Sequence, residues 1–270
     1  MEFSGISLAL IEVFFVFALS YVVKISNFNL YQIHPIPYYW LTFTIMTGIW
    51  EFYFVTNYKE TTRHALNLLN NKTHIWTSPY DSSYLLPSKF SILFYSEYAA
   101  YGDRMYMTKN DDWSRVIEGS HLLMCGIFAL LGLYFKSRVD NNKTINNKNN
   151  FNTPNDKEDV KDVKDVKDEK DIYYISRYFL TIGISMAAQY MNSVLYMVNY
   201  FHQTRDSNNP NYNTQDFPTG KVLYKRPFMY VNILWFTMPV IVLNYLLSYA
   251  NTYTLIDSKK VENTIPIVPE

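Results

Sequence analysis

Cysteine is nearly absent from this chain of 270 residues, because Cys125 is its one cysteine and lies in an apolar run. A single cysteine excludes an intramolecular disulfide and a cysteine-rich metal site. The net charge at pH 7 is zero, so the chain lacks the basic character that nucleic-acid phosphates demand. It also has no Gly-rich phosphate loop, no nucleophile elbow and no His-Glu-x-x-His motif. We therefore predict no metal, no cofactor and no nucleic-acid partner.

Apolar residues are concentrated in five runs, each long enough for a helix that crosses a bilayer. The runs cover residues 5–23, 38–57, 113–135, 178–201 and 228–249. A cleaved signal peptide is the alternative for the first run, but the basic start and small-residue cleavage site are missing. A soluble bundle of long buried helices is the alternative for the whole set, and five such runs make it the weaker one. We predict an all-α polytopic membrane protein built as a five-transmembrane-helix bundle, whose orientation the Lys and Arg distribution leaves open.

The segments between the runs differ in character. Residues 58–95 are mixed in polarity, with Pro79 and Pro87 as helix breakers, and predict a long ordered loop or a pair of surface helices. A low-complexity segment is first Asn-rich and then repeats Lys-Asp-Val with a period of three, which matches neither helix nor strand. We predict one domain in four stretches: helices one to three in 1–138, a disordered linker in 139–171, helices four and five in 172–254, and a polar tail in 255–270.

Three ionisable residues inside the apolar runs are candidates for chemistry, because burying such groups in a membrane is expensive. Glu51 lies deep in the second run and predicts a proton donor or a cation stabiliser; a neutral carboxyl bonded to a neighbouring helix is the alternative. Glu118 and His121 are three residues apart and share one helix face. A carboxyl beside an imidazole is a reasonable acid–base pair, and a polar cap near the membrane interface is the alternative.

Further polar groups lie at the ends and on the faces of the runs. Four charged residues precede the third run and predict the mouth of a cavity: Asp103, Arg104, Asp111 and Asp112. On the fifth run, the amide of Asn232 and the indole of Trp235 are one turn apart and can face one pocket, where an indole stabilises a cation. Helix packing with a kink at Pro239 is the alternative there. A similar polar stripe lies on the fourth run: Gln189, Tyr190, Ser193 and Tyr196.

Several short motifs occur in an order that matches a known family. They are Glu51-Phe-Tyr-Phe-Val, Glu97-Tyr98, Gly102-Asp103, Tyr106, an aspartate before Glu118, Val194-Leu195-Tyr196, and Asn232-Ile-Leu-Trp235-Phe-Thr-Met-Pro239. Each motif is weak alone. The ordered set, over roughly residues 40–135 and 175–250, resembles the emopamil-binding protein family, the sterol Δ8–Δ7 isomerases within the EXPERA group.

The resemblance implies a multi-pass protein of the endoplasmic reticulum membrane with a sterol cavity between its helices. Family enzymes protonate a ring alkene, stabilise the carbocation and remove a different ring proton. Glu51, Glu118, Asn232 and Trp235 match functional positions of the family. We expect Glu51, Glu118 and His121 to be catalytic, and a second group to bind the sterol: Thr47, Tyr190, Ser193, Asn232 and Trp235.

Two positions depart from the family pattern, because Thr47 stands where the family has histidine and Ser193 where similar isomerases have aspartate. His121 stands where family members carry a small hydroxyl residue, so imidazole and hydroxyl are exchanged between two helices. If both positions face one cavity, His121 supplies the imidazole from the opposite wall. The alternative function is a non-catalytic sterol or lipid binder with a chaperone or trafficking role. A transporter is less favoured because no internal repeat is present, and the oligomeric state, with a homodimer among the alternatives, stays open.

Overall fold

The computed structural model of the chain describes residues 2–108, 112–139, 157–212, 214–215, 217 and 227–262. The side chains of 157–169, 227–229 and 252–262 are outside this description. The described chain is mostly helical, in agreement with the predicted all-α class.

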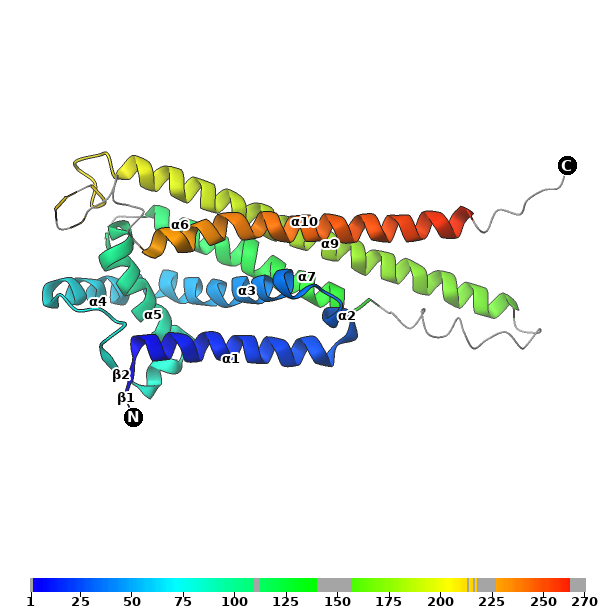
Figure 1. Cartoon of the computed structure of the whole chain (residues 1–270), viewed down its shortest axis with the longest axis horizontal. Coiled ribbons are helices and arrows are strands. Elements are labelled where there is room, and N and C mark those ends of the chain that lie inside the picture. Colours follow the sequence, from blue (N-terminus) through cyan, green and yellow to red (C-terminus); the bar gives the residue numbers. More distant parts are fainter. Residues whose placement is uncertain are drawn as a thin grey trace.

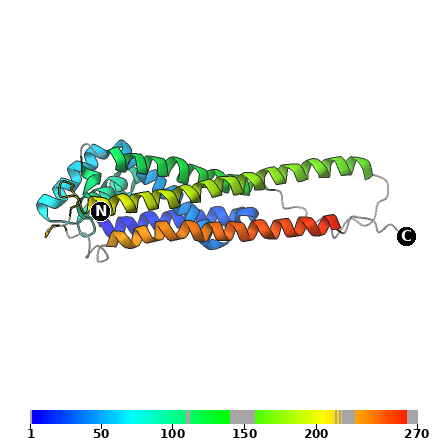
Figure 2. The same cartoon turned by 90° about the horizontal axis from the view of Figure 1, so that it is seen from above.

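Each apolar run forms a long helical segment, and these segments lie side by side along the long axis of the molecule (Figure 1). They are α1 (Gly5–Ser26), α3 (Pro35–Thr56), the series α6 (Asp112–His121), η4 (Leu122–Ile127) and α7 (Phe128–Ser137), α9 (Lys157–Gln203) and α10 (Pro227–Glu262). Helices α9 and α10 pack against each other and extend beyond the other helices at one end (Figure 2). Among the described residues, three segments are long and apolar enough to cross a membrane: Gly5–Ser26, Asp112–Ser137 and Tyr230–Asn251.

Shorter elements gather near the N-terminal end of α1 (Figure 1). They are β1 (Glu2–Ser4), α4 (Tyr58–Asn71), β2 (Pro79–Asp81), η1 (Ser82–Leu85), α5 (Pro87–Glu97), η2 (Tyr98–Gly102) and η3 (Arg104–Met107), while α2 (Phe28–Tyr31) lies at the other end of α1. Strand β1 pairs antiparallel with β2, with Phe3 opposite Tyr80. The segment 58–95 therefore contains a pair of helices, as one of the two predicted alternatives had it, but α5 is largely buried and does not lie on the surface.

Local sequence explains where the helices begin and end. The hydroxyl of Ser4 accepts a hydrogen bond of 3.3 Å from the backbone N–H of Ser7 and caps the first turn of α1. Pro35 opens α3, where a missing N–H costs no helical hydrogen bond. Helix α4 ends at Lys72, whose φ of 53° gives the left-handed conformation that stops a helix.

Helix α1 has an inside-out distribution of side chains. It buries Glu12, Ser20 and Lys24 against the protein, while Phe14 is 75% exposed and Phe15 is 63% exposed. In water such a surface would be unfavourable, but lipid tails solvate exposed apolar side chains and polar groups turn inward. The pattern supports a membrane-embedded protein, which the three apolar helices also indicate.

The predicted disordered linker differs from the structure in its second half. Residues 140–156 lie outside the described part of the chain, but α9 begins at Lys157, so residues 157–171 are helical. The period of three in the sequence does not form an apolar stripe, yet a helix extends more easily from an existing helix than it nucleates. The ends of the predicted linker are also buried, since Val139 is 5% and Asp171 is 6% exposed.

Candidate active site

A cavity of about 640 Å³ lies between α1, α3, α5, α6, α9 and α10. Most of its wall is apolar or aromatic, and polar side chains occur at a limited set of positions: Thr47, Glu51, His74, Glu97, Glu118, His121, Gln189, Asn192, Ser193 and Asn232. Small-molecule sites have volumes of roughly 300–1000 Å³ and this kind of mixed lining. The cavity is therefore large enough for a rigid lipid of moderate size.

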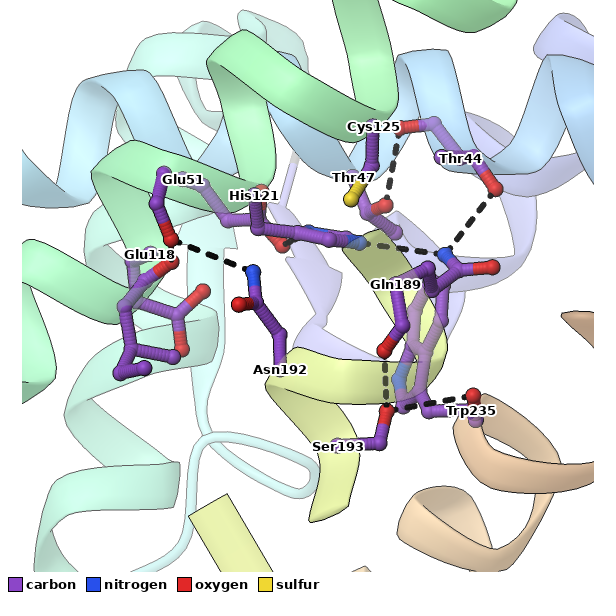
Figure 3. Close-up of polar contacts among 12 residues, drawn as sticks. Thr44, Thr47, Glu51, Glu118, His121, Cys125, Gln189, Asn192, Ser193 and Trp235 are labelled. Atoms are coloured by element: carbon purple, nitrogen blue, oxygen red, sulfur yellow. Dashed lines mark hydrogen bonds and ion pairs between the residues drawn. The ribbon is translucent and has the colours of Figure 1, made fainter. Parts of the chain in front are cut away.

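The predicted catalytic residues meet on one wall of this cavity (Figure 3). Nδ1 of His121, from α6, forms a hydrogen bond with Oε1 of Glu51, from α3. Both side chains are buried, with Glu51 4% exposed and His121 8% exposed. Ligand atoms of Glu118, one turn before His121, lie within 4.8 Å of those of both residues. The structure thus brings together the three groups that the sequence placed on two different runs.

The orientation of Gln189 determines the tautomer of His121. The indole N–H of Trp40 donates a hydrogen bond of 2.8 Å to Oε1 of Gln189, and an indole can only donate. Nε2 of Gln189 is therefore the amide nitrogen, which donates to Thr44 Oγ1 at 3.3 Å and faces His121 Nε2 at 3.1 Å. His121 Nε2 must then accept, so the imidazole is neutral and carries its hydrogen on Nδ1, directed at Glu51.

Glu118 has a different environment from Glu51. Its Oε1 accepts a hydrogen bond from Tyr106, and its Oε2 accepts one of 3.4 Å from Tyr95. Burial, reinforced by the nearby Glu118, raises the pKa of the Tyr106 phenol well above its ordinary value, so this group stays neutral and donates. Oε2 of Glu51, by contrast, has no hydrogen-bond partner among the described residues. The two carboxyls are therefore suited to opposite protonation states.

A close approach of two glycines brings α3 against η4. A Cβ added at Gly48 would lie 3.5 Å from Cα of Gly126, so the two backbones are nearly in contact. Small residues allow this distance between membrane helices. The six residues of η4 are π-helical, and π-helical turns occur frequently at functional sites. This local geometry places the end of α6, with His121, opposite Glu51.

The predicted sterol-binding residues are only partly in the cavity. Thr47, Ser193, Asn232 and Trp235 line it, and Tyr190 instead packs against Phe236 with tilted rings whose centroids are 4.8 Å apart. The ring of Trp235 lies edge-to-face against His121 at 5.3 Å. The hydroxyl of Thr47 is within 3.1 Å of the carbonyl of Thr44, to which it donates.

Three of the predicted mouth residues, Asp103, Arg104 and Asp112, do not line the cavity. Asp103 is 2% exposed and accepts hydrogen bonds from Tyr196 at 2.8 Å and from Asn211 at 2.6 Å, so it joins η3 to α9 and the following loop. The guanidinium of Arg104 lies 4.0 Å from the centre of the Phe217 ring. Asp112 is exposed and pairs with Arg115. Asp111 lies outside the described residues.

Sequence reasoning missed several contributors to the site. Tyr95 and Tyr106 donate to Glu118, but Tyr106 was recognised only as part of a family motif and Tyr95 not at all, because nothing in their spacing connects them to α6. A second acid–imidazole pair, His74 and Glu97, also lines the cavity, with Nδ1 and Oε1 2.6 Å apart. Gln189 was noticed as part of a stripe, but its role depends on Trp40 and Thr44, which only packing brings near.

Glu51, Glu118 and His121 are also the group of side chains in the described chain that could hold a metal ion. Two carboxylates and an imidazole are a suitable donor set for a divalent ion. In the structure, however, Nδ1 of His121 and Oε1 of Glu51 are hydrogen-bonded to each other, so these two atoms are not arranged around an ion.

Comparison of the chain with protein-family models, curated proteins and solved structures found no match. The function must therefore be argued from the geometry of the cavity and from the motifs of the sequence.

Proposed function

We propose that this protein spans the membrane with five helices, binds a sterol or a lipid of similar size in the cavity, and shifts a ring double bond by proton transfer. The observation that carries the proposal is the cluster of buried Glu51, buried His121 and half-buried Glu118 on the wall of an aromatic cavity. An apolar cavity with convergent acid and base groups is what an alkene isomerase needs, because both proton transfers occur away from water.

The proton donor in this proposal is Glu51. Two carboxyls within 4.8 Å of each other, Glu51 buried and Glu118 half-buried, resist double ionisation, so the pair shares one proton. The phenols of Tyr106 and Tyr95 stabilise Glu118 as the carboxylate, which leaves the proton on Glu51. Its Oε2 bears that proton and has no partner among the described side chains. Neutral His121 then stabilises the Glu51 carboxylate through Nδ1–H when the proton leaves.

The reaction requires no redox partner. The alkene takes the proton of Glu51 and becomes a carbocation, and the electrons of a neighbouring C–H bond form the new double bond when that proton leaves to Glu118. Trp235 and the tyrosines of the wall stabilise the cation with their ring faces, each by about 0.5–2 kcal/mol. After product release, Glu118 gives its proton to water and Glu51 takes a proton up from water, which resets the site and introduces solvent hydrogen into the next product.

The remaining parts of the proposal rest on the sequence motifs. The emopamil-binding resemblance supports a sterol as the ligand and the endoplasmic reticulum membrane as the location. Helices α3 and α9 provide the two additional spans, since each carries one of the five apolar runs.

A non-catalytic sterol or lipid binder is the second candidate. The hydrogen bond from the Gln189 amide to Nε2 of His121 favours this candidate. Because Nε2 accepts this bond, His121 cannot become an imidazolium without losing it, and a neutral imidazole is a weak acid. The hydroxyls of Thr47 and Ser193 donate to backbone carbonyls of their own helices, so their hydrogens are not directed at a substrate.

One experiment separates the two candidates. Purified protein is incubated with a Δ8 sterol in deuterated water, and the product is analysed by mass spectrometry, while binding is measured separately. An isomerase yields a Δ7 product that contains solvent deuterium, and Glu51→Gln, which keeps the shape but not the proton, abolishes turnover and retains binding. Saturable sterol binding by the wild type without any product establishes the binder.

A further inference from the structure

A second cavity, of about 250 Å³, lies at the opposite end of the bundle, near α2 and the end of α7. Its polar lining includes His34, Lys136 and Tyr249, and its apolar wall includes Val242 and Leu246 of α10. None of these residues lines the larger cavity. The two cavities are therefore separate sites with different chemistry.

Lys136 is the unusual residue of this cavity. It is only 2% exposed, so its amine is enclosed by the protein, whereas the amine of a lysine at a helix end ordinarily stays in water. Its Nζ donates to the hydroxyl of Tyr249 at 2.9 Å and lies 4.8 Å from the centre of that ring. Among the described residues it has no carboxylate partner. A buried ammonium without a counter-charge is costly.

Lys24, at the same end of the bundle, shows how a buried lysine is satisfied by the protein alone. Its Nζ donates to the backbone carbonyls of Leu30 at 2.8 Å, Tyr31 at 2.9 Å and Ile33 at 2.5 Å. Three acceptors use all three N–H groups. Lys136 has one such acceptor and a cavity beside it, so two of its N–H groups are available to a ligand.

Two other donors accompany the ammonium. Nδ1 of His34 accepts a hydrogen bond of 3.3 Å from the backbone N–H of Ile36, so its hydrogen is on Nε2. The hydroxyl of Tyr249 accepts from Lys136 and keeps its own hydrogen to donate. Ring stacking on Tyr245, with centroids 4.4 Å apart, fixes the plane of His34. The cavity is thus lined by an ammonium, an imidazole N–H and a phenol O–H.

We infer that this cavity binds the phosphate group of an anionic phospholipid, whose chains lie along the exposed apolar face of α10. Three donors suit a tetrahedral oxyanion with several free oxygens better than a two-oxygen carboxylate. The volume suits a headgroup, and α10, which lines the cavity with Val242 and Leu246, also carries Leu247, which is 60% exposed. The bound phosphate supplies the counter-charge that Lys136 lacks.

The test is calorimetric titration of the full-length protein in neutral detergent with dihexanoyl phosphatidic acid, kept below its micelle concentration. Saturable binding is expected. Lys136→Met should weaken it by roughly 10-fold to 100-fold, because the interaction is a charge-assisted hydrogen bond. The matched control is Arg138→Met, which removes the same charge from an exposed position outside the cavity and should change affinity by less than about 3-fold.

A second variant and two control ligands test the assignment independently of Lys136→Met. His34→Ala, at an exposed position, should weaken binding by about 3-fold to 10-fold even if Lys136→Met does not fold. Inorganic phosphate and dihexanoylglycerol, titrated separately, should each bind more weakly than the phospholipid. Equal affinities for inorganic phosphate and the phospholipid, no saturable binding, or equal losses in Lys136→Met and Arg138→Met would overturn the assignment. Sterol turnover is measured in parallel, and its outcome does not affect this test.

Discussion

The amide of Gln189 connects three side chains that come from different parts of the sequence. It accepts from Trp40 and donates to Thr44 and to Nε2 of His121, so each of its polar atoms has a partner. The imidazole is held neutral, with Nδ1–H directed at Glu51. In the proposed reaction His121 is therefore a positioning and charge-stabilising group, and Glu51 is the acid.

This assignment predicts the behaviour of two substitutions of His121. His121→Ala removes the donor to Glu51 and should lower turnover by roughly 10²–10⁴-fold, the usual contribution of an acid–base group, with little change in sterol affinity. His121→Asn places an amide N–H near the position of Nδ1 and should recover part of the loss. Turnover is measured by product formation and affinity by equilibrium binding.

The control variant for this prediction is Thr47→His, which adds an imidazole on α3 and leaves the Glu51–His121 bond in place. It should be tolerated or mildly activating. Equal turnover in the wild type and in His121→Ala would contradict a role for this imidazole in the reaction.

The start of helix α1 packs directly against the backbone of the loop that precedes β2. The N–H of Ile6 donates to the carbonyl of Trp76 at 3.3 Å, and a Cβ on Gly5 would lie only 2.2 Å from the carbonyl oxygen of Ile75. Backbone cannot move aside as a flexible side chain can. The same loop carries His74, which lines the larger cavity, so the start of α1 supports one wall of the site.

We therefore expect Gly5→Ala to destabilise the protein by about 1–3 kcal/mol, the usual cost of forcing extra volume into a packed site. The measurement is thermal unfolding in detergent, followed by tryptophan fluorescence. Gly183→Ala is the matched control, since nothing lies within 4 Å of an added Cβ there. That change in a helix interior should be neutral or stabilising by about 0.5–1 kcal/mol. Equal melting temperatures for the two variants would contradict the close contact.

At the scale of the whole molecule, the low-complexity segment 139–171 connects α7 to the apolar part of α9 within one helix bundle. Val139 and Asp171 are buried, and the carbonyl of Val139 accepts a hydrogen bond from Asn29, so both ends belong to the folded protein. The dispensable part is therefore shorter than the low-complexity region and lies within residues 140–169.

Replacing residues 140–169 by a short Gly-Ser linker should preserve membrane insertion and ligand binding, because Gly-Ser chains are flexible and impose no new geometry. Size-exclusion chromatography and sterol binding of the purified variant are the measurements. A deletion that also removes Val139 and Asp171 is the comparison and should lower thermal stability. Loss of binding in a folded 140–169 variant would show that this segment contributes to the site.

The sequence by itself determined the helices and the candidate acids. Long apolar runs specify helices because a lipid or core environment leaves backbone groups no other partner, and Glu51, Glu118 and His121 were conspicuous because such groups are costly in those runs. Tertiary structure alone decided how these groups act. The bond from His121 to Glu51, the Gln189 amide and the phenols of Tyr95 and Tyr106 join elements distant in sequence. Such contacts depend on how the helices pack against one another, so they cannot be predicted from the hydrophobic periodicity of any single segment.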